Sequence, residues 1–320
     1  MSKIYKIDGS IIDNLLFTPE AYGAVGDGIA DDTQAVQSAI NNKYVSCMSG
    51  KTYKITSKLR IKEGGFINLN GSTFLCAGTH LLFNFDDGDS YSGYNGNGNI
   101  TICNGTIIGG CISFIHGKHI RLFNLHFRNA LNDHFMEICA CKDYIISDCS
   151  FVGMAYRENA ALEYINIDTN ASYSAFPHNK SGQNDPVFYD MSTNEDIVVR
   201  NCYFALGEDT YAFGFDAVGV HSRNVSATYA KNVVIDNNQI VGFTGCGIRI
   251  NAMDGAYVCN NNIQTVGDGI RIGDVADTKN VVIKGNYVVS SEGDKLVRTS
   301  GQYTNLTVSD NVTEGDSQQF

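Results

Sequence analysis

Five short lines of the sequence place ionisable and amide side chains at matching positions beside aliphatic residues. The lines are HFMEI (134–138), EYINID (163–168), AVGVHS (217–222), CGIRIN (246–251) and DGIRIG (268–273). Alternate side chains of a β-strand point to opposite faces, so the aliphatic residues predict one buried face. The residues assigned to the opposite, outward face are Glu137, Asn166, His221, Arg249 and Arg271. The edges of the same lines carry His134, Glu163, Asp168 and Asp216.

The carboxyl groups of this face point first to glycoside hydrolysis. That reaction needs two carboxyls, one of them protonated as a general acid. Glu137, Glu163 and Asp168 are the predicted acid/base set, and His221 is the predicted catalytic residue that assists proton transfer. Two crowded carboxylates would raise one pKa, which suits a general acid. The predicted substrate-binding residues are His134, Asn166, Asp216, Arg249, Tyr164 and Tyr211.

A second chemistry stays open for the same residues. A lyase or an epimerase acting on uronates removes the proton beside a carboxyl while a cation neutralises the carboxylate. His221 or His134 could be the base, and Arg249 could be the cation. Ca²⁺ held by carboxylates could neutralise instead, but the chain shows no acidic motif of fixed spacing. No cofactor and no metal site are therefore predicted.

Structural interpretations stand beside the catalytic ones. A single outward polar residue on a solenoid is as readily explained by solvated surface as by catalysis. Glu163 could bond backbone amides where its strand begins, and Tyr164 and Tyr211 could be loop packing or sugar platforms. The cluster as a whole is harder to explain as plain surface, because crowded ionisable groups mark functional sites.

A second set of repeated lines indicates how these residues are positioned. Between positions 145 and 313 the chain repeats YIISDCSF, IVVRNCYF, VVIDNNQI, YVCNNNIQ, VVIKGNYV and LTVSDNVT. The same place in the line is held by Cys149, Cys202, Asn238, Asn261, Asn286 and Asn311. The regular return of a β-type line predicts stacked coils. Asparagine tolerates the left-handed backbone of a bend, and stacked asparagines can hydrogen-bond as a ladder.

The segment AYGAVGDGIADDTQAVQSAIN (21–41) predicts a helix at the start of the solenoid. Asp31 or Asp32 can cap this helix. Its apolar side is formed by Ala35, Val36, Ala39 and Ile40. Such a helix would cover the open apolar end of the first coil.

The same segment resembles the opening motif YGAxGDGxxDDTxAxQxAI of the pectate-lyase-like right-handed parallel β-helix superfamily. This superfamily includes polygalacturonases, pectate lyases, alginate epimerases and phage tailspike depolymerases. The coil repeats extend the resemblance from Pro19 onward. It implies an all-β, right-handed parallel β-helix with an N-terminal capping α-helix, a polysaccharide substrate and a homotrimer like that of tailspikes.

The polygalacturonase motifs are only partly present. GED (207–209), GVHS (219–222) and GIRI (247–250) echo a DD pair, a GHG and an RIK in that order. Glu208 replaces one Asp of the pair, Asn251 replaces the Lys, and the sequence contains no NTD. The catalytic mechanism of that family is therefore not assigned.

The composition of the chain limits the partners and the cellular location that can be expected. The chain has 320 residues, 43% hydrophobic residues and a net charge of −11, which disfavours nucleic acid as a partner. Ten cysteines without a CxxC predict buried free thiols and a reducing compartment. The N-terminus lacks the apolar run of a signal peptide, and no stretch reaches membrane-spanning length. We expect a soluble protein made in the cytoplasm, without a membrane partner, that is released or associated with a phage virion.

The sequence thus predicts a lead-in over residues 1–20 and one β-helix domain over residues 21–320, with a long loop insertion at about 169–195. The favoured function is a depolymerase that hydrolyses a complex, bacterial-surface polysaccharide. The alternatives are a uronate polysaccharide lyase or epimerase, and a non-catalytic glycan-binding phage tail module.

Overall fold

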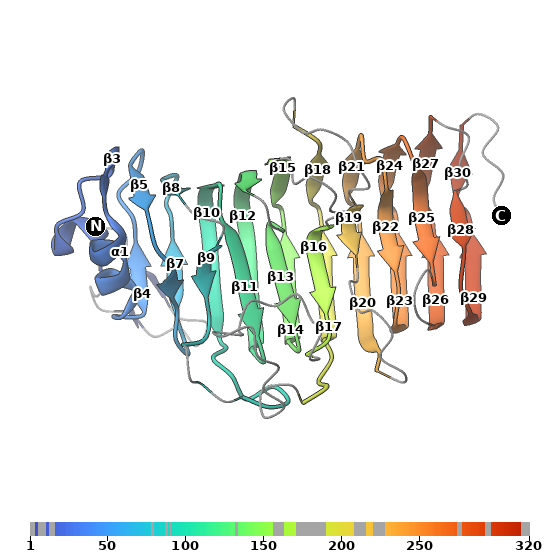
Figure 1. The fold of residues 1–320 in the computed structure, drawn as a ribbon, viewed down its shortest axis with the longest axis horizontal. Coiled ribbons are helices and arrows are strands. Elements are labelled where there is room, and N and C mark those ends of the chain that lie inside the picture. Colours follow the sequence, from blue (N-terminus) through green and yellow to red (C-terminus); the bar gives the residue numbers. More distant parts are fainter. Residues whose placement is uncertain are drawn as a thin grey trace.

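Aliphatic side chains line the inside of a solenoid in the computed structural model of this protein, and its coils follow one another from one end to the other (Figure 1). The structure describes residues 17–77, 80–86, 89, 91–131, 134–155, 163–170, 190–207, 216–219, 228–273, 277–291 and 296–314, and the backbone of 4–5 and 11–12. No helix in these ranges has the length and apolar character needed to cross a bilayer.

Each full coil contributes one strand to each of three parallel sheets. Sheet 1 has nine strands, namely β6 (Leu59–Arg60), β9 (His80–Phe83), β11 (Cys111–Ile115), β13 (Met136–Cys139), β16 (Glu163–Asp168), β19 (Asp216–Gly219), β22 (Cys246–Ile250), β25 (Asp268–Ile272) and β28 (Val297–Thr299). Sheet 2 contains β4 (Tyr44–Ser46), β7 (Phe66–Asn68), β10 (Ile100–Ile108), β12 (Lys118–Leu131), β14 (Lys142–Ser147), β17 (Glu195–Arg200), β20 (Ala230–Asp236), β23 (Met253–Cys259), β26 (Thr278–Lys284) and β29 (Tyr303–Ser309).

Sheet 3 follows sheet 2 after a bend in each coil. Its strands are β3 (Asp27–Asp31), β5 (Thr52–Ile55), β8 (Thr73–Cys76), the second halves of β10 and β12, β15 (Ser150–Ala155), β18 (Tyr203–Ala205), β21 (Gln239–Val241), β24 (Asn262–Thr265), β27 (Tyr287–Ser290) and β30 (Val312–Thr313). The strands β10 and β12 run through the bend and pair in both sheets. Outside these sheets, β1 (Ile4–Tyr5) and β2 (Ile11–Ile12) form an antiparallel pair.

The bend between sheets 2 and 3 is built from a left-handed residue followed by a ladder residue. Asp148, Asn201, Asn237, Asn260 and Asp310 have φ between 53° and 57°. The expectation that the ladder asparagine itself has the left-handed backbone is wrong. The left-handed position belongs to the preceding residue, and it is held mostly by Asn and Asp because few other side chains tolerate positive φ.

The predicted asparagine ladder itself is confirmed. The backbone N and Nδ2 of Asn238 both lie 2.9 Å from Oδ1 of Asn261, and the same two bonds join Asn261 to Asn286 and Asn286 to Asn311. In the coil before, the backbone N–H of Cys202 donates to Oδ1 of Asn238. The ladder therefore satisfies buried backbone groups at a bend where sheet hydrogen bonds are interrupted.

Replacing Asn261 by Ala is expected to lower the free energy of unfolding by at least about 2 kcal/mol. The substitution leaves the N–H groups of Asn238 and the carbonyl of Ile235 buried without their partner, at about 1–3 kcal/mol for each orphaned group. Denaturant unfolding measures the change. The control is Asn262→Ala at the next, outward-facing position, and an equal loss in both variants would contradict the role of the ladder.

Two helices cover the N-terminal end of the solenoid. Helix η1 (Pro19–Tyr22) packs against helix α1 (Thr33–Ile40), and α1 contacts β4, β5 and β6. The predicted apolar residues of α1 are buried, so the expected capping helix is confirmed. Asp31 accepts a hydrogen bond from the N–H of Thr33, whereas Asp32 accepts from the N–H groups of Val25 and Gly26.

Candidate functional site

Two polar rows cross the outer face of sheet 1. We call the first the edge row, and it consists of His134, Glu163, Asp216, Cys246 and Asp268. We call the second the central row, and it consists of Ser113, Glu137, Asn166, Gly219, Arg249, Arg271 and Arg298. Strands of successive coils lie about 4.8 Å apart, so each row brings residues that are distant in sequence onto neighbouring rungs.

His134 lies between two carboxyl groups. Its Nδ1 is 2.5 Å from the backbone carbonyl oxygen of Glu163 and 3.8 Å from Oε2 of the same residue. Its Nε2 is 3.9 Å from Oε1 of Glu137. The short contact to a carbonyl makes Nδ1 the protonated nitrogen and turns Nε2 toward Glu137. The Ser113 hydroxyl donates to the other oxygen of Glu137, Oε2, at 3.3 Å.

Asp216 and Arg249 form a buried ion pair one coil further along. Arg249 Nε lies 2.6 Å from Asp216 Oδ2, and the backbone N–H of Cys246 donates to Asp216 Oδ1 at 2.7 Å. Burial raises the pKa of the Asp216 carboxyl to about 6, Glu163 adds to the rise, and Arg249 opposes it. The guanidinium is thus anchored at one end while 17% of the Arg249 side chain stays exposed to solvent.

The outward position next to Asn166 in the central row belongs to Gly219. The register pairs Asn166 with Gly219, so the placement of His221 in this row is wrong. The cause is an error of alignment, because Gly219 is the residue that stands between Val218 and Val220. A Cβ atom at Gly219 would lie 2.4 Å from Cγ of Glu163, so the absence of a side chain makes room for that carboxyl group. Gly219 was not predicted as a site residue, although its position between Val218 and Val220 marks it as outward-facing.

The cluster is buried, and a solvated surface does not explain it. Glu137 is 2% exposed, Glu163 is 4% exposed, and all six residues of β16 are buried on both faces of the strand. His134, Asn166 and Asp216 are buried as well. Charged groups are seldom fully buried unless they are paired, which is the arrangement seen here.

Two predicted residues are placed apart from this cluster. Tyr164 packs in the core, with its ring centroid 5.0 Å from that of Phe135, and its hydroxyl donates to the carbonyl of Ala205. The prediction that Tyr164 contacts substrate is therefore wrong, and the packing interpretation holds. Asp168 is five residues from Glu163 on β16, about 16 Å along an extended strand, and its Oδ1 accepts the N–H of Thr169.

Two further predicted residues, His221 and Tyr211, lie outside the described residues. The same holds for positions 171–189 of the predicted loop insertion. The structure therefore brings together His134, Glu137, Glu163, Asn166, Asp216 and Arg249 of the predicted set.

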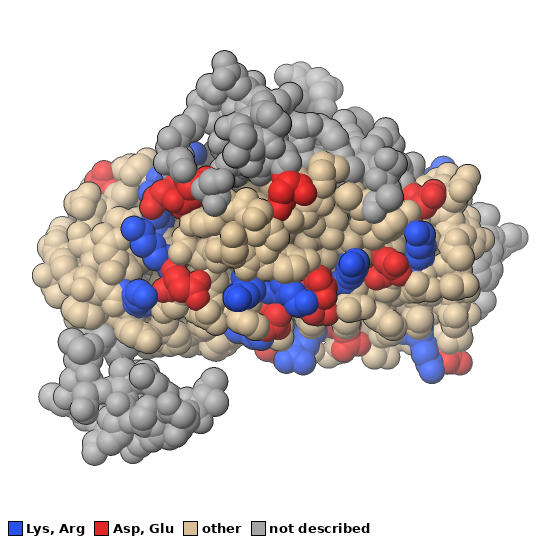
Figure 2. Space-filling model, turned by 90° about the horizontal axis from the view of Figure 1, so that it is seen from below, with Lys and Arg blue, Asp and Glu red and all other residues tan. Residues whose placement is uncertain are grey.

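The last coils extend the cluster with cations. Arg271 Nη2 lies 2.7 Å from Oδ2 of Asp268, and Arg298 Nη1 lies 3.6 Å from the same oxygen. One face of the molecule shows acidic and basic side chains intermixed along the solenoid (Figure 2). In the part of the chain that the structure describes, no group of three or more His, Cys, Asp and Glu side chains is arranged to hold a metal ion.

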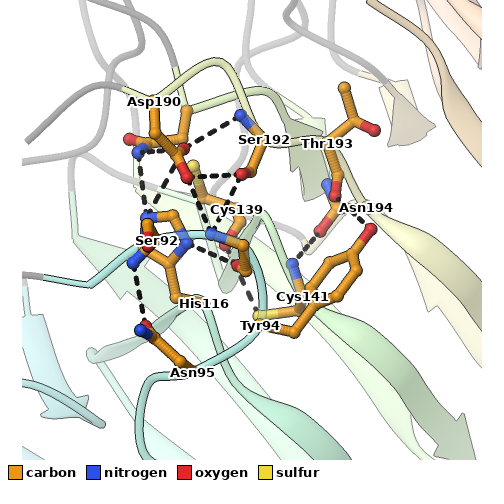
Figure 3. A network of polar contacts seen from close by, with 12 residues as sticks. Ser92, Tyr94, Asn95, His116, Cys139, Cys141, Asp190, Ser192, Thr193 and Asn194 are labelled. Atoms are coloured by element: carbon orange, nitrogen blue, oxygen red, sulfur yellow. Dashed lines mark hydrogen bonds and ion pairs between the residues drawn. The ribbon is translucent and has the colours of Figure 1, made fainter.

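A second buried polar network, which the sequence did not predict, surrounds His116 (Figure 3). Nδ1 of His116 is 2.7 Å from the carbonyl oxygen of Gly93, and Asn170 Nδ2 is 2.9 Å from its Nε2. Asp190 accepts hydrogen bonds from Gly93, from Ser192 and from Asn170. The network joins the segment around Gly93 to residues 190–192. We call it the clamp, because it holds these two connecting segments together.

Acidification is expected to weaken this clamp. Burial lowers the pKa of His116, although the Gly93 carbonyl and Asp190 both favour the protonated ring. A lowered folded-state pKa means that the unfolded chain binds the proton more readily. The contribution of His116 to stability is thus full above about pH 6.5 and declines as the pH falls below that value.

Unfolding measured across this pH range checks the clamp. His116→Gln, which cannot titrate, should flatten the decline below about pH 6.5. His119→Gln is the control, because His119 is an exposed histidine that pairs with Asp143. An unchanged slope in His116→Gln would contradict the assignment.

The three parallel sheets and the stacked coils define a single-stranded parallel β-helix fold. Comparison with solved structures agrees and gives the right-handed form. PfbA, a surface adhesin of Streptococcus pneumoniae, superposes with a TM-score of 0.78 at 20% identity over 95% of this chain and 86% of that chain. A tailspike mutant of E. coli bacteriophage HK620, in complex with a hexasaccharide, superposes with a TM-score of 0.71 at 13% identity over 96% of this chain and 59% of that chain.

Sequence comparison finds relatives of the same two kinds. Plasmin and fibronectin-binding protein A of Streptococcus pneumoniae is 23% identical over 279 residues, which are 75% of this chain and 38% of that protein. A capsule K30/K69-specific depolymerase of Klebsiella phage K64-1 is 35% identical over 92 residues, which are 23% of this chain and 12% of that protein. The chain therefore matches well under half the length of either relative. No protein-family model matches the sequence.

Proposed function

We propose that this protein is a polysaccharide depolymerase that hydrolyses glycosidic bonds with Glu137 and Glu163 as its acid/base pair. The observation that carries the proposal is the buried cluster in which His134 lies between these two carboxyl groups on neighbouring coils. Glycoside hydrolysis requires two carboxyls in different protonation states, and Glu137 and Glu163 supply two neighbouring carboxyls on either side of one imidazole.

The remaining residues of the cluster have positioning roles in this proposal. His134 fixes the two carboxyl groups relative to each other. Arg249, anchored by Asp216, presents its exposed part to the substrate and can pair with a carboxylate or bond a hydroxyl group. Asn166, between Glu137 and Gly219 in the central row, would bond a sugar hydroxyl. The relatives named as a depolymerase and as a tailspike in complex with a hexasaccharide support a glycan as the ligand.

Product analysis tests the reaction class. The protein is incubated with capsular, exopolysaccharide, pectic and alginate preparations, and the products are weighed by mass spectrometry. Hydrolysis gives fragments whose combined mass exceeds that of the parent by one water per cut. Unsaturated products that absorb ultraviolet light would instead identify a uronate lyase, and deuterium uptake without cleavage would identify an epimerase. Either result would overturn the hydrolase proposal.

A second candidate function is glycan binding without cleavage. The similarity in fold to PfbA, a surface adhesin, supports binding without cleavage. Retention of the protein on a glycan array without any product after long incubation would select this function.

Assembly and location stay predictions. A homotrimer is expected from the resemblance to tailspikes, and light scattering coupled to size-exclusion chromatography measures it. Association with a phage virion is expected on the same ground, and antibodies against the protein would label tails if it holds.

A further inference from the structure

A groove runs along the outside of the bend between sheets 2 and 3, away from the polar rows of sheet 1. It has a volume of about 610 Å³ and crosses the ends of β14, β17, β20 and β23, which follow one another along the axis (Figure 1). Its floor includes the left-handed residues Asp148, Asn201, Asn237 and Asn260. The volume lies within the range of ordinary ligand sites.

The chemistry of the groove suits an uncharged ligand rich in hydroxyl groups. Among the described residues that line the groove there is no Lys or Arg, Asp148 is the one carboxylate, and His126 is the one imidazole. Most of the other outward groups are amides, together with the ring of Tyr203. The side-chain amide of Asn or Gln has two N–H donors and a carbonyl oxygen that can accept two hydrogen bonds. The hydrogen bond that the Asn237 side chain donates to Asn201 uses one of the two N–H groups of Asn237.

Each coil places one outward side chain in the groove at the same register position, and these side chains are His126, Ser150, Tyr203, Gln239 and Asn262 in chain order. Tyr203 pairs in register with Gln239, and Gln239 pairs with Asn262. Adjacent coils lie about 4.8 Å apart, which is close to the length of one sugar ring in an extended glycan. A glycan lying along the axis would therefore meet one polar or aromatic side chain at each successive ring.

Hydrogen bonds between side chains hold some of these groups in place before any ligand arrives. Asn201 donates to Asp148 at 3.1 Å, Asn237 donates to Asn201 at 2.9 Å, and the bend beneath them is fixed by the buried ladder. Tyr203 is 39% exposed, so one surface of its ring is open to solvent. A preorganised row of amides beside an open aromatic ring lowers the entropy cost of binding.

We propose that this corner groove binds a strand of neutral polysaccharide along the solenoid axis, with Tyr203 stacked on a sugar ring and Gln239 and the bend amides bonded to its hydroxyl groups. The groove lies on a different face from Glu137 and Glu163, so this binding does not depend on the proposed cleavage. Its effect would be to hold the polymer while another segment is processed or anchored.

The absence of tryptophan from the chain allows a direct test. Tyr203→Trp creates a single fluorescent reporter in the groove. Tyr257→Trp is the matched control, because Tyr257 is 42% exposed on β23 and does not line the groove. Each variant is titrated with maltohexaose, cellohexaose, laminarihexaose, xylohexaose, mannohexaose and hexagalacturonate.

The expected result is a saturable emission change in Tyr203→Trp with at least one neutral hexasaccharide, and none in Tyr257→Trp. Adding Gln239→Ala should weaken that binding about tenfold, as the loss of a hydrogen bond near 1.4 kcal/mol would do. Adding Glu163→Gln should leave it unchanged, which separates this proposal from the cleavage proposal. The proposal is overturned if no neutral hexasaccharide changes the emission of Tyr203→Trp, or if hexagalacturonate alone does so. It is also overturned if Tyr203→Trp and Tyr257→Trp respond equally.

Discussion

Replacing Glu163 by Gln is expected to slow glycan cleavage about 10²–10⁴-fold while the fold stays intact. Glutamine keeps the shape of the side chain, so it still fits above Gly219, but it can neither donate nor accept the catalytic proton. Glu137→Gln should act in the same way, because His134 holds both carboxyl groups in one cluster. Initial rates of oligosaccharide release measure the loss.

The pH profiles of the two variants distinguish the roles of the two carboxyl groups. Loss of the general acid removes the alkaline limb of the profile, and loss of the base or nucleophile removes the acidic limb. Glu195→Gln is the matched control, since Glu195 is a carboxylate of sheet 2 that pairs with Lys142 at 2.7 Å. Full activity in both Glu137→Gln and Glu163→Gln would contradict the assignment of these two residues as the acid/base pair.

Replacing Gly219 by Ala is expected to reduce activity nearly as far, although the new methyl group carries no chemistry. Its Cβ would lie 2.4 Å from Cγ and 3.3 Å from Cδ of Glu163, so the carboxyl group must leave its place beside His134. Overpacking of this kind costs about 1–3 kcal/mol of stability. Activity and denaturant unfolding are both measured.

A double-mutant cycle isolates the cause of this effect. Glu163→Ala removes Cγ, so adding Gly219→Ala to that variant should cost little further stability. If Gly219→Ala destabilises both backgrounds equally, the glycine serves the backbone of β19 rather than the carboxyl group. The cycle therefore separates a positioning role from a general structural one.

Periodicity in the sequence was sufficient to predict the architecture. The returning line of β-type residues predicted the coils and the ladder from Asn238 to Asn311, because both depend on a local pattern that repeats, and the capping helix followed from the separate pattern of residues 21–41. The convergence of Glu137, Asn166 and Arg249 followed from the same strand alternation. Short-range rules sufficed there, since a solenoid places one coil directly on the next.

Features that depend on departures from the repeat could not be predicted in this way. Alternation alone would turn Tyr164 outward with Asn166, but its ring enters the core beside Phe135. The clamp around His116 is formed by residues of connecting segments, which carry no periodic signal, and the burial of all six residues of β16 also departs from strand alternation. Sequence spacing also cannot show that Gly219 makes room for a glutamate from the preceding coil.

The ladder has a mechanical consequence. Its rungs join positions 23, 25, 25 and 36 residues apart, so each coil is held chiefly by the coil beneath it. A force applied at the C-terminal end would therefore peel coils away singly instead of shearing the whole sheet at once. Each peeled coil would lengthen the chain by about 80 to 120 Å. A protein built in this way can yield in steps under load while its remaining coils stay folded.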